Sequence, residues 1–173
     1  FNGGCLPVTR HRISKNISPS QSEGSLIRQN NKVVGSTIIG QNFTNPANFW
    51  GRPSATSPMP YNAAASSGSN LGPLNPALTD AVKTRMAALR AADPSNATAI
   101  PIDLVTTSAS GLDPHISMAA AQYQIGRVAR MRALSPQSVQ ALIDQYTHRP
   151  LLAVLGEPIV NVLQLNLALN AIK

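Results

Sequence analysis

"LLAVLGEPIVNVLQLNLALNAIK", residues 151–173, is the one long apolar run of the chain, and it decides the fold class. A helix that spans a membrane needs about 20 mainly apolar residues. Glu157 and Pro158 interrupt this run, and Asn161, Asn166 and further polar residues punctuate its second half. The run therefore predicts a buried strand followed by an amphipathic helix that begins near Asn161, and we expect the chain as written to be soluble.

Three more helices have clear start signals upstream of this run. Asn75-Pro76, Ser117 and Ser135-Pro136 mark the starts, because Asn and Ser cap helices and Pro suits the first turn. Asp93-Pro94 is expected to end the first of these helices. Apolar residues follow each start at helical spacing, namely Leu78, Val82, Met86 and Leu89, then Met118, Ala121, Ile125 and Val128, and then Val139, Leu142, Ile143 and Tyr146.

Short strands are expected between and before the helices. Residues 25–29 and 32–39 are rich in β-forming residues and are separated by Asn30 and Asn31, which suit a hairpin turn. "AIPIDLVT" (99–106) and "PLLAVLG" (150–156) are two further strand candidates. The pattern predicts an α+β protein, one compact domain of about four helices with a small sheet.

Two stretches outside these elements have unusual compositions. Residues 1–22 show no hydrophobic period, so we interpret them as an atypical, irregular N-terminal segment before a folded domain of residues 23–173. Residues 40–77 are dense in Gly, Pro, Asn and Ser but also contain Phe49, Trp50 and Tyr61. A structureless loop of this length is uncommon in a compact domain. The aromatic residues favour a specific, tightly turned segment over disorder.

The charge balance is strongly basic and leaves several kinds of partner open. Lys and Arg number 14 against 7 Asp and Glu, for a net charge of +7. Such a charge suits nucleic acid, an anionic membrane surface or an acidic partner. The only compact basic cluster is Arg127, Arg130 and Arg132, whose spacing spreads the side chains over a wide arc of a helix. We interpret this cluster as a solvated helix end, and keep a basic nucleic-acid-binding domain as an alternative function.

Asp113 and His115, in "SASGLDPHIS" (108–117), are the obvious candidates for catalysis. They could move protons or bind a metal, but the same residue types form turns. Cys5 is the only cysteine, which excludes an internal disulfide and a cysteine-based metal site. No GxSxG motif is present. We therefore favour a specific loop or docking surface here, and a small hydrolase that uses Asp113 and His115 is a less favoured alternative.

Five stretches, taken in order, resemble a known family. They are "GSTIIGQNFTNPANFWGRPSAT", "MPYNAAASSGSNLGPLNPAL", "VTTSASGLDPHIS", "RVARMRALS" and "GEPIVNVLQLNLAL". Together they resemble the C subunit (KdpC) of the bacterial high-affinity potassium-transporting P-type ATPase, the Kdp complex. The resemblance runs from about Gly24 to Lys173.

This resemblance implies a non-catalytic accessory subunit that assembles and stabilises an ATP-driven potassium-import complex in the bacterial inner membrane. Its implied partners are the potassium-channel-like subunit and the ATP-hydrolysing subunit, with no nucleic acid. ATP, Mg²⁺ and K⁺ belong to the complex, so no cofactor is expected in this chain. Family members carry an N-terminal membrane helix before a periplasmic domain. Residues 1–22 depart from that pattern, and we expect the family's membrane anchor to be missing or replaced here.

The candidate residues for subunit contacts come from residues 40–77, which contain the aromatic side chains, and from the stretch 108–117, which contains Asp113. Aromatic rings offer apolar contact area at low entropic cost, and an arginine offers a planar donor. The alternative is that the aromatic residues pack in the domain's own core. The candidates are Phe49, Trp50, Arg52, Tyr61, Asp113 and His115.

Overall fold

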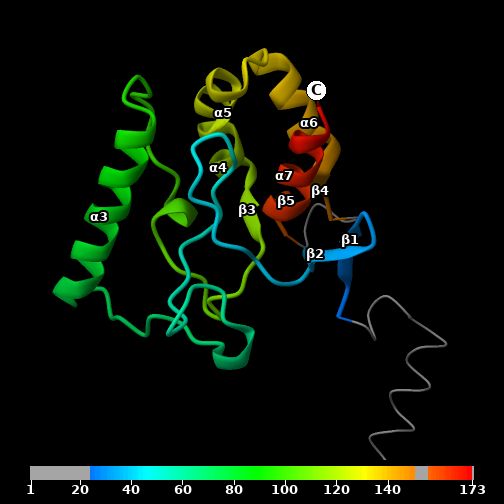
Figure 1. Cartoon of the computed structure of the whole chain (residues 1–173). Coiled ribbons are helices and arrows are strands. Elements are labelled where there is room, and N and C mark those ends of the chain that lie inside the picture. Colours follow the sequence, from blue (N-terminus) through cyan, green and yellow to red (C-terminus); the bar gives the residue numbers. More distant parts are fainter. Residues whose placement is uncertain (1–23, 151–155, 173) are drawn as a thin grey trace, which may run out of the picture. The chain divides into compact units, whose positions relative to one another are not determined.

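The computed structural model describes residues 24–150 and 156–172. The chain divides after Ile38 into two compact units, which are considered separately. Within the described residues there are five α-helices and two small sheets, so the predicted α+β class is confirmed (Figure 1). The predicted count of about four helices was one too low.

The first unit contains the predicted hairpin. Strand β1 (Leu26–Gln29) pairs antiparallel with β2 (Lys32–Ser36), and Gln29 lies opposite Lys32. Asn30 and Asn31 form the turn with φ angles of 49° and 63°. Asparagine tolerates this left-handed conformation better than most residues, and two such residues form the turn that matches strand twist. The hairpin prediction is confirmed, although β2 is shorter than expected.

The second unit is built around a three-stranded antiparallel sheet in the order β3-β5-β4. Its strands are β3 (His115–Ser117), β4 (Thr147–His148) and β5 (Ile159–Asn161). Ile116 lies opposite Val160 in the β3–β5 pair, and both side chains are buried. Strand β3 comes from the stretch that the sequence analysis interpreted only as a loop. Of the predicted strand at 150–156, residues 151–155 lie outside the described part of the chain.

One predicted strand is wrong. Residues 102–104 of "AIPIDLVT" form the 3-10 helix η2 (Ile102–Leu104) instead. Leu104 is buried, while Asp103 accepts hydrogen bonds from the N–H (2.8 Å) and the hydroxyl (3.2 Å) of Ser117. These tertiary contacts fix a tight turn that the local β-propensity did not predict.

The helices begin where the capping residues predicted. Asn75 accepts a hydrogen bond from Ala77 N–H, Ser117 from Ala120, Ser135 from Ser138 and Asn161 from Gln164, all at 3.0–3.1 Å. Each bond satisfies a backbone donor that the helix itself leaves free. The helices are α3 (Pro76–Ala92), α4 (Met118–Tyr123), α5 (Ile125–Arg132), α6 (Pro136–Tyr146) and α7 (Val162–Ala171).

The second predicted helix is in fact two, α4 and α5, separated at Gln124. The side chain of Gln124 is buried and donates to the carbonyls of Ala120 and Trp50, both at 3.1 Å. Its carbonyl group Oε1 accepts from Trp50 N–H at 2.8 Å. The break therefore lies where a side chain binds a distant backbone segment, which helical periodicity alone does not predict.

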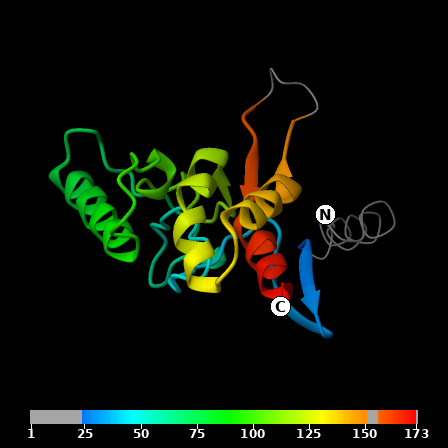
Figure 2. The same ribbon diagram turned by 90° about the horizontal axis from the view of Figure 1, so that it is seen from above.

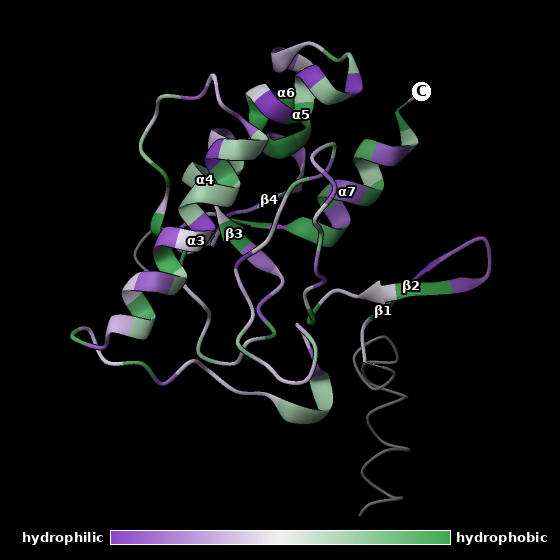
Figure 3. Cartoon of the chain, turned by 60° about the vertical axis from the view of Figure 1, so that its left-hand side comes forward, coloured by the Kyte–Doolittle hydropathy of each residue, from purple (hydrophilic) through white to green (hydrophobic). Residues whose placement is uncertain are grey.

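The core lies between the sheet and the helices α4 to α7. Phe49, Val128, Ile143 and Leu165 are completely buried there. We call residues 40–77 the irregular segment. Helix α3 lies at the opposite end of this unit from α6 and α7, with α4, α5 and the irregular segment between them (Figure 2). It carries hydrophobic and hydrophilic residues along its length (Figure 3), and only Leu89 of its residues is buried.

The irregular segment is tightly turned, as predicted from its aromatic residues. It contains one short 3-10 helix, η1 (Ala63–Ala65), and is held by side-chain hydrogen bonds. The hydroxyl of Ser54 donates to Gly111 O at 2.7 Å and accepts from Tyr61 N–H at 2.9 Å. Among the residues that the structure describes, no helix is long and apolar enough to cross a membrane.

Candidate functional site

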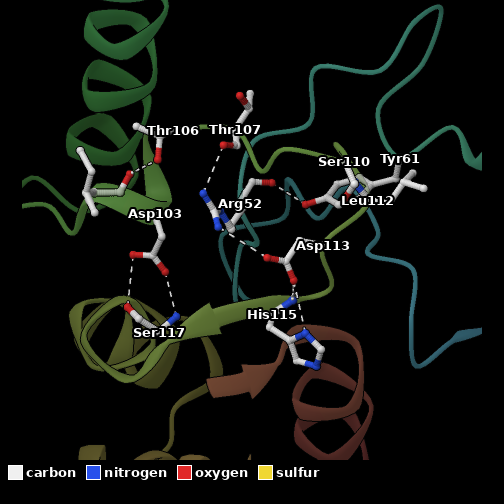
Figure 4. Close-up of polar contacts among 11 residues, drawn as sticks. Arg52, Tyr61, Asp103, Thr106, Thr107, Ser110, Leu112, Asp113, His115 and Ser117 are labelled. Atoms are coloured by element: carbon white, nitrogen blue, oxygen red, sulfur yellow. Dashed lines mark hydrogen bonds and ion pairs between the residues drawn. The ribbon is translucent and has the colours of Figure 1, made fainter. Parts of the chain in front are cut away.

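A polar cluster forms where the irregular segment meets the start of β3. Arg52 and Tyr61 come from the irregular segment, Asp113 from the loop before β3, and His115 from the first position of β3 (Figure 4). Four of the six predicted contact residues are thus brought together although they are far apart in the chain. We call Arg52, Tyr61, Asp113 and His115 the polar cluster.

Asp113 is the centre of this cluster. Its Oδ2 lies 3.5 Å from Arg52 Nη1, and its Oδ1 accepts from His115 N–H at 3.0 Å and lies 3.3 Å from His115 Nδ1. Arg52 also donates to Thr107 O at 3.2 Å, so it lies between the two loops (Figure 4). The carboxylate therefore holds an arginine and a histidine in fixed positions.

Hydrogen bonds and charge together stabilise the ionised form of Asp113. Burial alone raises the pKa of this carboxyl group. The hydrogen bonds from His115 and the positive charge of Arg52 outweigh burial, and the pKa of Asp113 lies below its ordinary value. Asp113 is consequently a carboxylate at neutral pH and is unsuited to act as a general acid.

Tyr61 supports the cluster through the backbone of Arg52. Its hydroxyl donates to the carbonyl of Arg52, and its backbone has a left-handed φ of 58°. Its ring lies against Gly40, where an added Cβ would overlap the ring and approach Asp113 O to 2.8 Å. Burial, and then the negative charge of Asp113, raise the pKa of Tyr61 to about 12, with Arg52 opposing. The glycine thus permits a close approach that fixes the tyrosine.

A cleft of about 760 Å³ adjoins the cluster and is bordered by Arg52, Asp113 and His115. Its other walls come from η2, the start of α4 and β5, and include the apolar side chains of Met118 and Ile159. Ile102 stands at its edge with 71% of its surface exposed. An exposed apolar side chain beside satisfied charged groups is typical of a protein-contact surface.

The cluster does not contain the parts of a hydrolytic site. Asp113 and His115 resemble the orienting acid and the base of a triad. However, no hydroxyl group in residues 24–150 or 156–172 hydrogen-bonds to the ring of His115. Ser117 Oγ, the nearby candidate, bonds instead to Asp103 and caps α4. No group of three or more His, Cys, Asp or Glu side chains converges in the described part of the chain to hold a metal ion.

The remaining two predicted contact residues lie deeper. Phe49 is completely buried in the core, which was the alternative interpretation of the aromatic residues, and it presents no surface to a partner. Its N–H donates to Asn166 Oδ1 at 2.8 Å, and its carbonyl accepts from Asn166 Nδ2 at 2.9 Å. Trp50 is partly buried, and Gln124 binds both of its backbone groups. The roles of all six residues in subunit contacts stay predictions.

The arginine cluster on α5 was predicted to be a solvated helix end, and this prediction is wrong for Arg127, which is buried, whereas Arg130 is exposed. Arg127 is 2% exposed, lies 4.6 Å from the centre of the Trp50 ring and donates to Pro46 O and Asn48 O. Burial lowers the pKa of Arg127 to about 10. Arg130 pairs with Asp93 at 2.5 Å, and Arg132 donates to Asn48 and to α7. Arg127 and Arg132 hold the irregular segment, whereas the side chain of Arg130 pairs with Asp93 and remains 53% exposed. The charge of Arg127 is therefore not available to nucleic acid.

Three polar residues were not predicted from the sequence to be buried: Gln124 was not noted, and Asn166 and Arg127 were noted only as a polar interruption and as part of the basic cluster. Asn166 interrupts the apolar run LQLNLAL, and Gln124 interrupts the apolar face of α4 and α5. A polar residue on a buried face must find a hydrogen-bond partner. Gln124, Arg127 and Asn166 form their hydrogen bonds with the backbone of the irregular segment.

Comparison with known proteins identifies the family. The family described as "KdpC: K+-transporting ATPase, c chain" matches residues 1–171. A protein of Variovorax paradoxus named potassium-transporting ATPase KdpC subunit is 63% identical over 171 residues, covering 99% of this chain and 89% of the relative. The chain belongs to the KdpC family.

Other KdpC relatives match over the full chain. The KdpC subunits of Polaromonas naphthalenivorans and Herpetosiphon aurantiacus are 62% and 63% identical over 173 residues, and the chain covers 88% and 90% of their lengths. The KdpC match begins at residue 1 and therefore includes residues 1–22, further than the resemblance quoted from Gly24. Those residues lie outside the described part, and the missing or replaced anchor stays a prediction.

Proposed function

We propose that this chain is an accessory subunit, without a catalytic centre of its own, that assembles and stabilises an ATP-driven potassium-import complex. The observation that carries the proposal is the KdpC match over 171 of the chain's 173 residues. Relatives about 60% identical are named as KdpC subunits of a potassium-transporting ATPase. ATP, Mg²⁺ and K⁺ are then handled by the other subunits of the complex.

The geometry of the polar cluster supports a role in binding rather than in chemistry. Asp113 is held as a carboxylate by Arg52 and His115, and each of these groups has a partner within the domain. Pre-organised charged groups give specificity to a contact because they need not be ordered on binding. The cleft beside them offers the apolar side chains that supply most of the affinity of protein contacts.

The partners in this proposal are the potassium-channel-like subunit and the ATP-hydrolysing subunit, with the folded domain on the outer side of the membrane. We place the contact surface at the cleft, centred on Ile102. Ile102 is a large apolar side chain at the border of the cleft, and 71% of its surface is exposed, so a partner that covers the cleft would bury it. The charged rim would fix the orientation of that contact.

Ile102→Asp tests this surface, with Met131→Asp as the matched control. Both side chains are apolar and exposed, 71% and 56%, but Met131 lies on α5 and does not border the cleft. Each variant is co-expressed with the other subunits, purified through a tag on the channel-like subunit, and assayed for potassium-stimulated ATP hydrolysis.

We expect Ile102→Asp to reduce recovery of the chain about tenfold or more, because a buried, unpaired carboxylate costs several kcal/mol at an interface. Met131→Asp is expected to leave recovery unchanged. Equal recovery of both variants would reject the cleft as the contact surface. Failure of the unchanged chain to bind the other subunits would reject the accessory function itself.

A further inference from the structure

A second pocket, distinct from the cleft, lies between α3 and the irregular segment. Its volume is about 360 Å³, within the range typical of small-molecule sites. Apolar side chains dominate its walls, among them Phe43, Trp50, Leu89 and Leu104. We call it the α3 pocket.

The charged groups of the α3 pocket are all positive. Arg85 and Arg52 border it, and none of the described residues that line it is acidic. Arg85 Nη1 donates to Val105 O at 2.8 Å, and none of the described carboxylates lies within 4 Å of its guanidinium nitrogens. Burial lowers the pKa of Arg85.

Arg52 adds a buried donor that has no partner in the described part of the chain. One end of its guanidinium binds Asp113 and Thr107, on the side of the cleft. Its Nε is buried and has no hydrogen-bond partner among the residues described. A buried donor without a partner is uncommon and costs free energy until a ligand or water satisfies it.

The apolar side of the pocket is rigid. Arg127 stacks on Trp50 at 4.6 Å, and Gln124 binds both backbone groups of Trp50. Trp50 Nε1 donates to Asn45 O at 3.0 Å. A pre-organised aromatic wall binds an apolar group with little loss of conformational entropy.

We propose that the α3 pocket binds an amphipathic organic carboxylate, whose apolar body lies against Phe43 and Trp50 and whose carboxylate reaches Arg85. A carboxylate matches the planar donor geometry of arginine, and it supplies the negative charge that the pocket lacks. An apolar body is needed because the walls are mainly hydrocarbon. The proposal does not rest on the proposed accessory function, although Arg52 borders both this pocket and the cleft.

Octanoate is a suitable probe, with acetate and 1-octanol as matched compounds that lack the apolar chain or the charge. Binding to the full chain is measured by isothermal titration calorimetry at constant ionic strength. Trp50, the only tryptophan, reports in parallel by fluorescence whether the pocket is occupied. We expect octanoate to bind and to change the fluorescence of Trp50, and acetate and 1-octanol to bind at least about tenfold more weakly.

Two pairs of variants locate the binding. Arg85→Gln is compared with Lys83→Gln, which removes a charge from the same helix outside the pocket. We expect about tenfold weaker octanoate binding in Arg85→Gln, because hydrogen bonds to charged groups contribute about 1.5–3 kcal/mol. Lys83→Gln is expected to bind as the unchanged chain does.

Ala88→Phe fills the pocket and is compared with Ala87→Phe, which adds the same ring outside it. Ala88→Phe should abolish octanoate binding, while Ala87→Phe should preserve it. Circular dichroism establishes that each variant is folded. Absence of octanoate binding to the unchanged chain, or equal binding by folded Ala88→Phe and Ala87→Phe, would overturn the proposal even if Arg85→Gln does not fold.

Discussion

Asn166 connects α7 to the irregular segment, and its replacement by leucine should strongly destabilise the domain. Asn166 is 1% exposed and forms two hydrogen bonds with the backbone of Phe49, which is itself completely buried. Leucine has the same branched shape as asparagine but is larger, so Asn166→Leu removes the hydrogen bonds and opens no cavity, while its extra volume adds to the destabilisation. Neither the N–H nor the carbonyl of Phe49 can then reach water.

The magnitude follows from the two unsatisfied backbone groups. Each buried group left without a partner costs about 1–3 kcal/mol, which gives about 2–6 kcal/mol for the pair. The added apolar surface of leucine offsets about 1 kcal/mol. We therefore expect the free energy of unfolding to fall by about 3 kcal/mol, a large part of the stability of an ordinary domain.

Urea denaturation of the full chain, followed by circular dichroism, measures this loss. Asn170→Leu is the control, because Asn170 lies one turn later on α7 and is exposed. Its hydrogen bond with Arg132 is at the surface, so we expect a loss below about 1 kcal/mol. A loss below about 1 kcal/mol in Asn166→Leu as well would refute the view that this asparagine fixes the irregular segment.

Three further predictions concern other parts of the same unit. The pKa of Asp113 in the folded state lies below its ordinary value of 3.8, so Asp113 contributes to stability above that pH, and the contribution is lost as the pH falls through the lower pKa. Asp113→Asn should therefore show a smaller loss of stability in acid. Thermal melts from pH 5 to pH 2 measure this difference. Arg127→Met keeps an unbranched, mostly apolar side chain but removes the guanidinium, which leaves the carbonyls of Pro46 and Asn48 unsatisfied. The free energy of unfolding, measured in urea, should fall by about 2–4 kcal/mol. Gly40→Ala should force Tyr61 from its place and cost more than about 1 kcal/mol, whereas an unchanged melting temperature would show that the ring can move at little cost.

The starts of α3, α4, α6 and α7 were predictable because N-capping is a local interaction. An asparagine or serine accepts the N–H of a residue two or three positions ahead, and the sequence alone contains both partners. The same holds for the hairpin, whose turn depends only on Asn30 and Asn31. Binary patterning likewise predicted the buried face of α6, whose Val139 and Ile143 are completely buried.

The candidate site was only partly predictable. Its six residues were chosen from the sequence, and four of them meet in the polar cluster. Their order around Asp113, and the burial of Phe49, depend on how two loops separated by about fifty residues fold against each other. The resemblance to KdpC predicted the family correctly, because similarity of sequence over a long range can be recognised without the fold being known.

The fold class, the starts of α3, α4, α6 and α7, and the hairpin could be inferred from local sequence, since each depends on residues within a few positions of one another. Only the tertiary structure decided the environment of Gln124, Arg127 and Asn166. Each is a polar residue on a buried face, and burial requires a hydrogen-bond partner without specifying which one. The partner is the backbone of residues 46–50, more than 70 positions away, and a contact of that separation is set by the packing of the whole unit.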